Sequence, residues 1–161
     1  MTVVTLHAPF AGWLAPLDEV PDAVFAERMM GDGFAIDPTE GVLRAPADGE
    51  VVSVPTSAHA ITLRLKNGAE ILLHIGLETV ALGGRGFSSL VTSGEHVFRG
   101  QPLIEFDLDQ VALKAKDLIT PVVAANGGSV RIISPSRLVT AGDAVAEVGA
   151  SGVSDLSLIH I

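Results

Sequence analysis

The fold is decided by one stretch in the middle of the chain, Ile61-Thr62-Leu63-Arg64-Leu65-Lys66-Asn67-Gly68-Ala69-Glu70-Ile71-Leu72-Leu73-His74-Ile75. Two apolar runs flank Asn67-Gly68, and this dipeptide in such a setting is the strongest short-range signal of a β-hairpin with a two-residue turn. In that register Ile61 lies opposite His74. The stretch therefore predicts two adjacent antiparallel strands.

Similar short, β-branched runs recur along the chain, and turns that contain glycine separate them. Many short strands at close spacing indicate an all-β fold, an antiparallel β-sandwich or barrel, rather than alternating strands and helices. One short helix is expected near Asp22, covering Phe25, and a second over residues 107–116, capped by Asp107. The second helix is expected to turn Leu108, Val111, Ala112 and Ala115 inward. The expected strands are residues 42–44, 50–54, 61–66, 69–75, 103–106, 122–124 and 129–133.

The composition of the 161 residues fits one folded domain and excludes several classes of function. The absence of cysteine excludes disulfides, thiolate metal sites and cysteine nucleophiles. No apolar run reaches the roughly 18 residues of a membrane span, and the first residues lack the features of a signal peptide, so a cytoplasmic protein is expected. The formal charge of −9 argues against a nucleic-acid partner and favours a basic protein partner.

A seven-residue pattern occurs twice, at residues 91–97 (VTSGEHV) and 139–145 (VTAGDAV). Each copy is typical of a glycine turn that leads into a strand. Two explanations stay open: the fold is built from duplicated units, or an all-β chain has reused the same turn chemistry. From Gly149 onward the composition becomes small and polar, which predicts a domain over residues 1–148 and a linker or added tail over 149–161.

His59 and His74 stand apart from the other histidines because the predicted hairpin places both on one face. They become diagonal neighbours on adjacent strands, with Cβ atoms roughly 7 Å apart. Two imidazoles so placed suit metal binding, phosphoryl transfer or a purely structural role. His7, His96 and His160 each lie alone near a turn or a terminus and are expected to be solvated or structural.

Five motifs follow one another along the chain: Val20-Pro21-Asp22-Ala23-Val24-Phe25-Ala26-Glu27, Gly31-Asp32-Gly33-Phe34-Ala35-Ile36-Asp37-Pro38, Ala45-Pro46-Ala47-Asp48-Gly49, Leu73-His74-Ile75-Gly76-Leu77-Glu78-Thr79-Val80 and Thr120-Pro121-Val122-Val123. In order and spacing they resemble the glucose-type enzyme IIA domain of the bacterial phosphoenolpyruvate:sugar phosphotransferase system. The resemblance runs from about Val20 to about Glu147 and implies an antiparallel β-sandwich of the duplicated hybrid type. It also implies a phosphocarrier.

The resemblance implies roles for individual residues. His74 corresponds to the histidine that accepts a phosphoryl group from phospho-HPr and passes it to a cysteine on the IIB domain of a sugar permease. His59 corresponds to the partner histidine that stabilises this group. Ser57 takes the place of a threonine that orients the active imidazole, and Glu78 takes the place of an aspartate found in many relatives. The implied docking rim for partners consists of Asp22, Ala23, Val24, Phe25, Met30 and Glu78.

The resemblance implies HPr and a IIB domain as partners, and contact with a membrane only through the permease. No cofactor is expected to be required, although His59 and His74 are candidates to share Zn²⁺ with a partner's carboxylate. The alternative function is a regulatory module whose phosphorylation state controls other permeases or kinases. The transported sugar, the oligomeric state and fusion to HPr and enzyme I stay open. A zinc peptidase and a biotinyl carrier are disfavoured because the chain has no His-x-His and no Met-Lys-Met.

Overall fold

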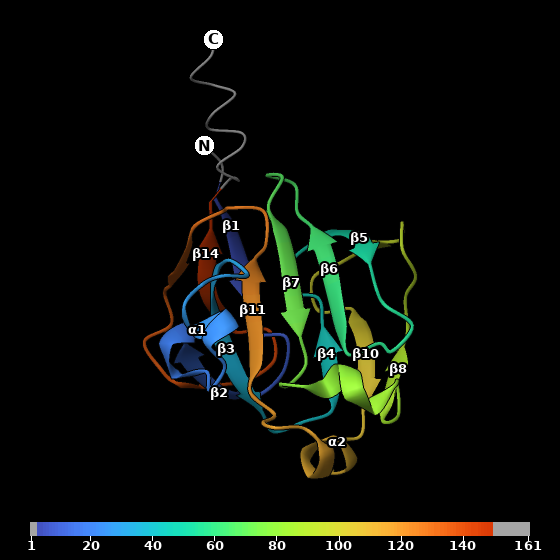
Figure 1. Ribbon diagram of the computed structural model, residues 1–161. Coiled ribbons are helices and arrows are strands. Elements are labelled where there is room, and N and C mark those ends of the chain that lie inside the picture. Colours follow the sequence, from blue (N-terminus) through green and yellow to red (C-terminus); the bar gives the residue numbers. More distant parts are fainter. Residues whose placement is uncertain (1–2, 150–161) are drawn as a thin grey trace.

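The computed structural model describes residues 3–149, and most of its regular structure is antiparallel β-sheet (Figure 1). The largest sheet among these residues has eight strands, each antiparallel to its neighbours. In spatial order they are β13 (Leu138–Val139), β2 (Gly12–Pro16), β3 (Asp32–Pro38), β11 (Thr120–Ala124), β7 (Glu70–His74), β6 (Ala60–Arg64), β5 (Gly49–Ser53) and β9 (His96–Val97).

Two three-stranded sheets pack against the inner face of this large sheet. One is β1 (Val4–His7), β14 (Ala144–Val148) and β12 (Val130–Ile132), and the other is β4 (Val42–Arg44), β10 (Pro102–Phe106) and β8 (Phe87–Ser89). Buried residues of all three sheets form one hydrophobic core. The predicted all-β sandwich is therefore confirmed.

A second, smaller apolar cluster covers part of the outer face of the large sheet. The 3₁₀-helix η1 (Leu17–Glu19) and the helix α1 (Ala23–Ala26) lie over β3 and β11 there (Figure 1). Val122 of β11 points into the main core while Val123 points into the outer cluster. Because β11 is covered on both faces, all five of its residues are buried, as expected for a central strand.

Two short α-helices occur among the described residues, at the predicted places. Asp22 caps α1 by accepting the Val24 N–H at 3.0 Å, and Asp107 caps α2 (Leu108–Lys114) by accepting the Gln110 N–H at 3.0 Å. The inward face of α2 is narrower than predicted, since Ala112 is exposed. Within residues 3–149, no helix has the length and hydropathy of a membrane span.

All seven runs predicted as strands contain a strand, within one or two residues at either end. Strands β1, β2, β3, β8 and β13 were not predicted, and β9 and β14 were expected only as the strands that follow the two repeated glycine turns. Glycine, proline and aspartate interrupt the apolar runs of β2 (GWLAP) and β3 (DGFAIDP), whereas β1 (VTLH) has the β-branched residues on which the prediction rests and was missed all the same.

The hairpin between β6 and β7 forms, but its predicted register is wrong by one residue. Leu65, not Lys66, lies opposite Ala69, since the Leu65 N–H donates to the Ala69 carbonyl at 2.9 Å. The loop has three residues and ends on Gly68 with φ 88°. Asn-Gly is compatible with a two-residue turn and with a three-residue loop. The three-residue loop also requires a left-handed residue at its last position, and glycine meets that requirement.

The two copies of the repeated sequence have the same local structure. In each, a threonine N–H donates to the carboxylate three residues later, from Thr92 to Glu95 at 2.6 Å and from Thr140 to Asp143 at 2.8 Å. The glycine between them has φ 92° or 93°, and each copy exchanges two backbone hydrogen bonds with a single residue of another segment. This equivalence supports the explanation by duplicated units. The predicted linker begins at the last described residue, and 150–161 lie outside the described range.

Candidate functional site

His59 and His74 meet on the outer face of the large sheet, beside α1. Their ring centroids are 5.0 Å apart and the rings are inclined at 78°. His74 ends β7, whereas His59 precedes β6 by one residue. The two rings border a cavity of about 430 Å³ lined by Ser53, Val54, Pro55, His59, Ala60, Ile61, Thr62, Leu72 and His74.

The two rings meet by a different route from the one predicted. The observed register pairs Ala60 with His74, and the Ile75 N–H donates to the His59 carbonyl at 2.8 Å. Regular alternation would then place the His59 side chain on the inner face. His59 instead lies in a bend after Ala58, which has φ 55°, and the bend turns the ring to the outer face. The shared face is thus produced by an irregular backbone, not by strand pairing.

A backbone carbonyl fixes the protonation pattern of His74. Its Nδ1 lies 2.8 Å from the Gly76 carbonyl oxygen, which can only accept a hydrogen bond. Nδ1 therefore carries the proton of the neutral ring, and Nε2 keeps a free lone pair. Desolvation lowers the pKa of His74, and it outweighs the Gly76 hydrogen bond and the charge of Asp22, both of which raise it. The ring is consequently neutral near pH 7.

His59 is held by Ser57, whose Oγ lies 2.6 Å from its Nδ1. The expectation that Ser57 orients His74 is corrected here, because the hydroxyl contacts His59 and Gly76 holds His74. The pKa of His59 is also lowered, first by desolvation and then by the nearby His74. His59 is 8% exposed, so little of its ring remains open.

Both Nε2 atoms nevertheless reach solvent. Within the described part of the chain, every buried side-chain nitrogen or oxygen has a hydrogen-bond partner. Each imidazole has its bonded contact at Nδ1, to Ser57 for His59 and to Gly76 for His74, and none at Nε2. The two Nε2 atoms are therefore the accessible polar atoms of the pair, available to a reacting group from solvent.

The loop after His74 is built to hold the Gly76 carbonyl in place. Gly76 has φ 69°, and a Cβ added there would lie 2.9 Å from both the Asp117 oxygen and the Thr79 side chain. The Gly76 N–H donates to the Thr120 hydroxyl at 3.3 Å, and the Thr79 hydroxyl donates to the Ile75 carbonyl at 2.7 Å. Gly76 and Thr120 lie in two of the motifs noted above, but the sequence alone assigned them no role.

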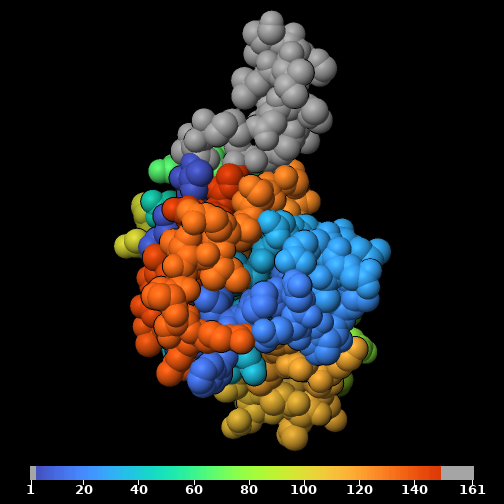
Figure 2. All heavy atoms as spheres, turned by 90° about the vertical axis from the view of Figure 1, so that its left-hand side faces the viewer, coloured from blue at the N-terminus to red at the C-terminus, as the bar shows by residue number. Residues whose placement is uncertain are grey.

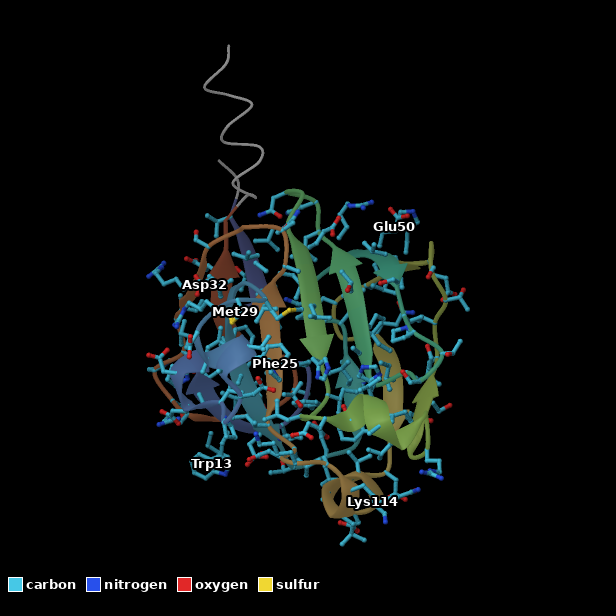
Figure 3. All side chains as sticks on the ribbon, viewed as in Figure 1. Trp13, Phe25, Met29, Asp32, Glu50 and Lys114 are labelled. Atoms are coloured by element: carbon cyan, nitrogen blue, oxygen red, sulfur yellow. The ribbon has the colours of Figure 1, made fainter. Side chains whose placement is uncertain are left out.

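The predicted docking rim contains both exposed and buried residues. Ala23, Val24 and Met30 are exposed, Val24 and Met30 at 40% each, and the first two belong to α1, whose Phe25 contacts His74. Phe25 is buried and packs its ring against His74, with centroids 5.4 Å apart. Its placement in the rim is corrected, because it supports His74 from below the surface. Figure 3 shows it between α1 and the end of β7.

The acidic members of the rim differ in their surroundings. Asp22 is half-buried at the cap of α1, close enough to His74 for its charge to raise the pKa of that ring. Glu78 is exposed, has φ 59°, and lies 4.0 Å from Lys116. Figure 2 shows the segment that carries α1 protruding from the molecule, where a partner can reach it.

Among residues 3–149, the two other histidines take no part in the site. His7 lies 3.2 Å from the Pro46 carbonyl and 3.0 Å from Arg99, and His96 is exposed in β9. His160 lies outside the described residues. Between residues 3 and 149, no group of three histidine, cysteine or acidic side chains is arranged to hold a metal ion. A metal bound by His59 and His74 would need its remaining ligands from elsewhere.

Comparison with known proteins gives a consistent result. Residues 4–130 match the family described as phosphoenolpyruvate-dependent sugar phosphotransferase system, EIIA 1. The chain is 49% identical over 144 residues to the PTS system glucose-specific EIIA component of Bacillus anthracis, covering 89% of this chain and 87% of that protein. It is 45% identical over 123 residues to the same component of Staphylococcus epidermidis, covering 76% and 74%.

The fold also has a similar counterpart among solved structures. It superposes on the glucose permease IIA from Mycoplasma capricolum with a TM-score of 0.86 and 42% sequence identity, covering 91% of this chain and 96% of that one. The similarity therefore extends to the whole sandwich, with the site included.

Proposed function

The chain belongs to the EIIA 1 family of the phosphoenolpyruvate-dependent sugar phosphotransferase system, and on that premise we propose that His74 is the residue that carries the phosphoryl group. A member of this family is a phosphotransferase component that takes phosphate from HPr and passes it to a IIB domain. The observation that supports the proposal is the bond between His74 Nδ1 and the Gly76 carbonyl, which leaves Nε2 unprotonated and open to solvent.

The first transfer follows from this geometry. The lone pair of His74 Nε2 attacks phosphorus on the phosphohistidine of HPr, forming a new N–P bond while the N–P bond of the donor breaks. The electron pair of the broken bond returns to the donor imidazole. His74 must be neutral to act as a nucleophile, and desolvation by the surrounding apolar residues lowers its pKa in that direction.

His59 is proposed to stabilise the transferred group. When the Ser57 hydroxyl donates to Nδ1 of His59, the proton of this ring lies on Nε2 and points out of the same hollow. The centroid of this ring lies 5.0 Å from that of His74. An N–H donor at this distance is suited to binding a phosphoryl oxygen as negative charge develops on that oxygen. In the second transfer a cysteine thiolate of IIB attacks phosphorus, and the electron pair of the N–P bond returns to His74.

The exposed rim supports docking of both partners on the same face. Ala23, Val24 and Met30 offer an apolar centre, while Asp22 and Glu78 offer negative charge to arginines of a partner. We further propose glucose as the transported sugar, because the similar proteins from Bacillus and Staphylococcus are named glucose-specific. A cytoplasmic location follows from the proposed exchange with HPr.

No metal ion has a part in the proposed transfer steps. A zinc ion at the two Nε2 atoms is proposed only in a complex, because His59 and His74 supply two ligands and the described chain offers no third histidine or acidic ligand beside them. A carboxylate of the partner and water would complete the tetrahedron. Fusion to HPr and enzyme I is not part of the proposal.

The test is a transfer assay with radiolabelled phosphoenolpyruvate, enzyme I and HPr. His74→Gln is expected to accept no label, whereas His59→Gln is expected to accept label from phospho-HPr and pass it poorly to IIB. His96→Gln changes an exposed histidine outside the site and serves as the matched control with normal transfer. Undiminished labelling of His74→Gln would overturn the assignment.

A further inference from the structure

Thr120 begins β11 and is fully buried, yet its side chain is polar. Its hydroxyl donates to the Leu118 carbonyl at 3.0 Å and accepts the Gly76 N–H at 3.3 Å. Because the hydroxyl proton is committed to Leu118, the oxygen lone pair is directed to Gly76. One side chain thereby ties the loop after His74 to the neighbouring strand.

The two peptide groups on either side of Gly76 are anchored to β11 and to the segment that leads into it. The peptide before Gly76 is held through its N–H by the Thr120 hydroxyl. The peptide after Gly76, whose carbonyl receives His74 Nδ1–H, is held by the Leu77 N–H, which donates to the Asp117 carbonyl at 2.8 Å. Since glycine resists backbone rotation less than any other residue, these two anchors determine where its carbonyl points.

A side chain is needed because the regular backbone ladder is interrupted here, and backbone pairing resumes only at the bridge between Leu77 and Asp117. The ladder between β11 and β7 is in register from Ala124 to Val122, and the next residue is Pro121, which has no N–H to donate. Thr120 follows beyond this interruption. Its hydroxyl supplies the contact to the β7 end that the backbone does not make.

We infer that Thr120 is a positioning residue for phosphoryl transfer: its hydroxyl holds the Gly76 backbone so that the Gly76 carbonyl keeps the His74 proton on Nδ1. This inference rests on the proposed function, because it concerns how the acceptor nitrogen is kept free. The Thr-Pro-Val-Val motif thus acquires a role in the site through its first residue. Thr120 itself touches neither histidine ring through a hydrogen bond.

The direct readout is the tautomer of His74 in the unphosphorylated protein. With nitrogen-15-labelled histidine, long-range proton–nitrogen spectra recorded where the ring is neutral identify the protonated nitrogen. Wild type and Thr120→Ser, which keeps the hydroxyl, are expected to hold the proton on Nδ1. Thr120→Val, which keeps the shape but not the hydroxyl, is expected to give a mixture of tautomers. Its transfer rate from phospho-HPr should fall about three- to tenfold, as for the loss of one hydrogen bond.

Thr79→Val is the matched control. It removes an equally buried hydroxyl from the same loop, one that bonds to the Ile75 carbonyl end of the same peptide group, while the Gly76 N–H stays bonded to Thr120. Stability should fall, but the His74 tautomer should remain Nδ1–H. The same tautomer mixture in this control would overturn the assignment, because it would show a general loosening of the loop. Where Thr120→Val fails to fold, Thr120→Ala replaces it with the same expected result.

The two proposals fail in different ways. An unchanged tautomer and an unchanged transfer rate in Thr120→Val overturn the inference, while His74→Gln would still abolish transfer. If His74 were not the acceptor, its tautomer would respond to Thr120→Val but the transfer rate would not. Rescue by Thr120→Ser of both tautomer and rate supports the positioning role.

Discussion

His74 is held by a backbone carbonyl, and this choice suits a nucleophile that must be neutral. A carboxylate at the same place would also keep the proton on Nδ1, but its charge would favour the protonated ring and raise the pKa. The Gly76 carbonyl fixes the same tautomer without a full negative charge, so it raises the pKa of His74 less than a carboxylate would. Desolvation remains the dominant influence, so the pKa of His74 is lowered overall.

The lowered pKa values of His59 and His74 predict a pH dependence of stability. Both rings bind a proton more readily in the unfolded chain than in the fold. Stability is therefore fully present above the ordinary histidine value of about 6.5 and is lost as the pH falls through that value towards the folded pKa. Urea unfolding should show a lower free energy at about pH 5.5 than at about pH 7.5, with a smaller difference in His59→Gln/His74→Gln. An equal difference in that variant would contradict the account.

Glu78 is expected to lower the stability of the fold while its charge assists contact with a partner. Its φ of 59° is sterically costly for glutamate, whereas asparagine adopts such values more readily. Glu78→Asn should therefore raise the free energy of unfolding by roughly 1 kcal/mol. Removal of the charge should at the same time slow acceptance from phospho-HPr. Chemical denaturation and transfer kinetics measure the two effects, and a destabilised variant would be inconsistent with backbone strain.

At the scale of elements, α1 joins the rim to the acceptor. This four-residue helix is too short to be stable alone, so its cap and its packed Phe25 hold it against the sheet. Asp22 is both the cap and a charge near His74. Its two roles can be separated by substitution.

Asp22→Ala and Asp22→Asn form a matched pair. Alanine removes cap and charge and should cost about 1 kcal/mol of stability, whereas asparagine is as good a cap and should cost little. Both variants lose the charge, so both should lower the His74 pKa and slow docking of phospho-HPr. Thermal unfolding and titration of His74 by NMR give the two readouts. A stability loss of equal size in both variants would show that capping is not the cause.

The hairpin shows how far sequence patterns carry. Two strands joined near Asn67-Gly68 could be predicted, because that dipeptide needs left-handed backbone. The register could not, since two-residue and three-residue turns make the same demand on Gly68. His59 reached the correct face only through the bend after Ala58, which no propensity of alanine indicates. The family motifs predicted the pairing of His59 and His74 correctly, whereas the register expected for a two-residue turn is not the one that produces it.

The contacts of Ser57 and Phe25 could not be predicted from the sequence either. Motif position assigned the Ser57 hydroxyl to His74, whereas the structure places it on His59. Phe25 lies in an apolar helix turn whose buried side depends on the packing of η1 and α1 over the sheet. Such assignments require tertiary structure, because one-dimensional patterns record burial but not the partner.

On the scale of the whole molecule, the net charge of −9 bears on the speed of partner encounter. A basic docking face on HPr would be attracted over a distance that salt shortens to about 8 Å at physiological ionic strength. The second-order rate of transfer should fall at least about fivefold between roughly 0.05 M and 0.5 M salt. Stopped-flow mixing measures this rate, and a rate independent of salt would refute electrostatic steering.

The central claim is that Nε2 of His74 forms the bond to phosphorus, and the most direct measurement is NMR of the phosphorylated protein. Nitrogen-15-labelled protein is phosphorylated by HPr, and the nitrogen shifts of its histidines are compared before and after. We predict a single phosphohistidine, at His74, with phosphorus on Nε2 and the proton retained on Nδ1, which donates it to the Gly76 carbonyl. Phosphorus on His59, or on Nδ1 of His74, would contradict the account.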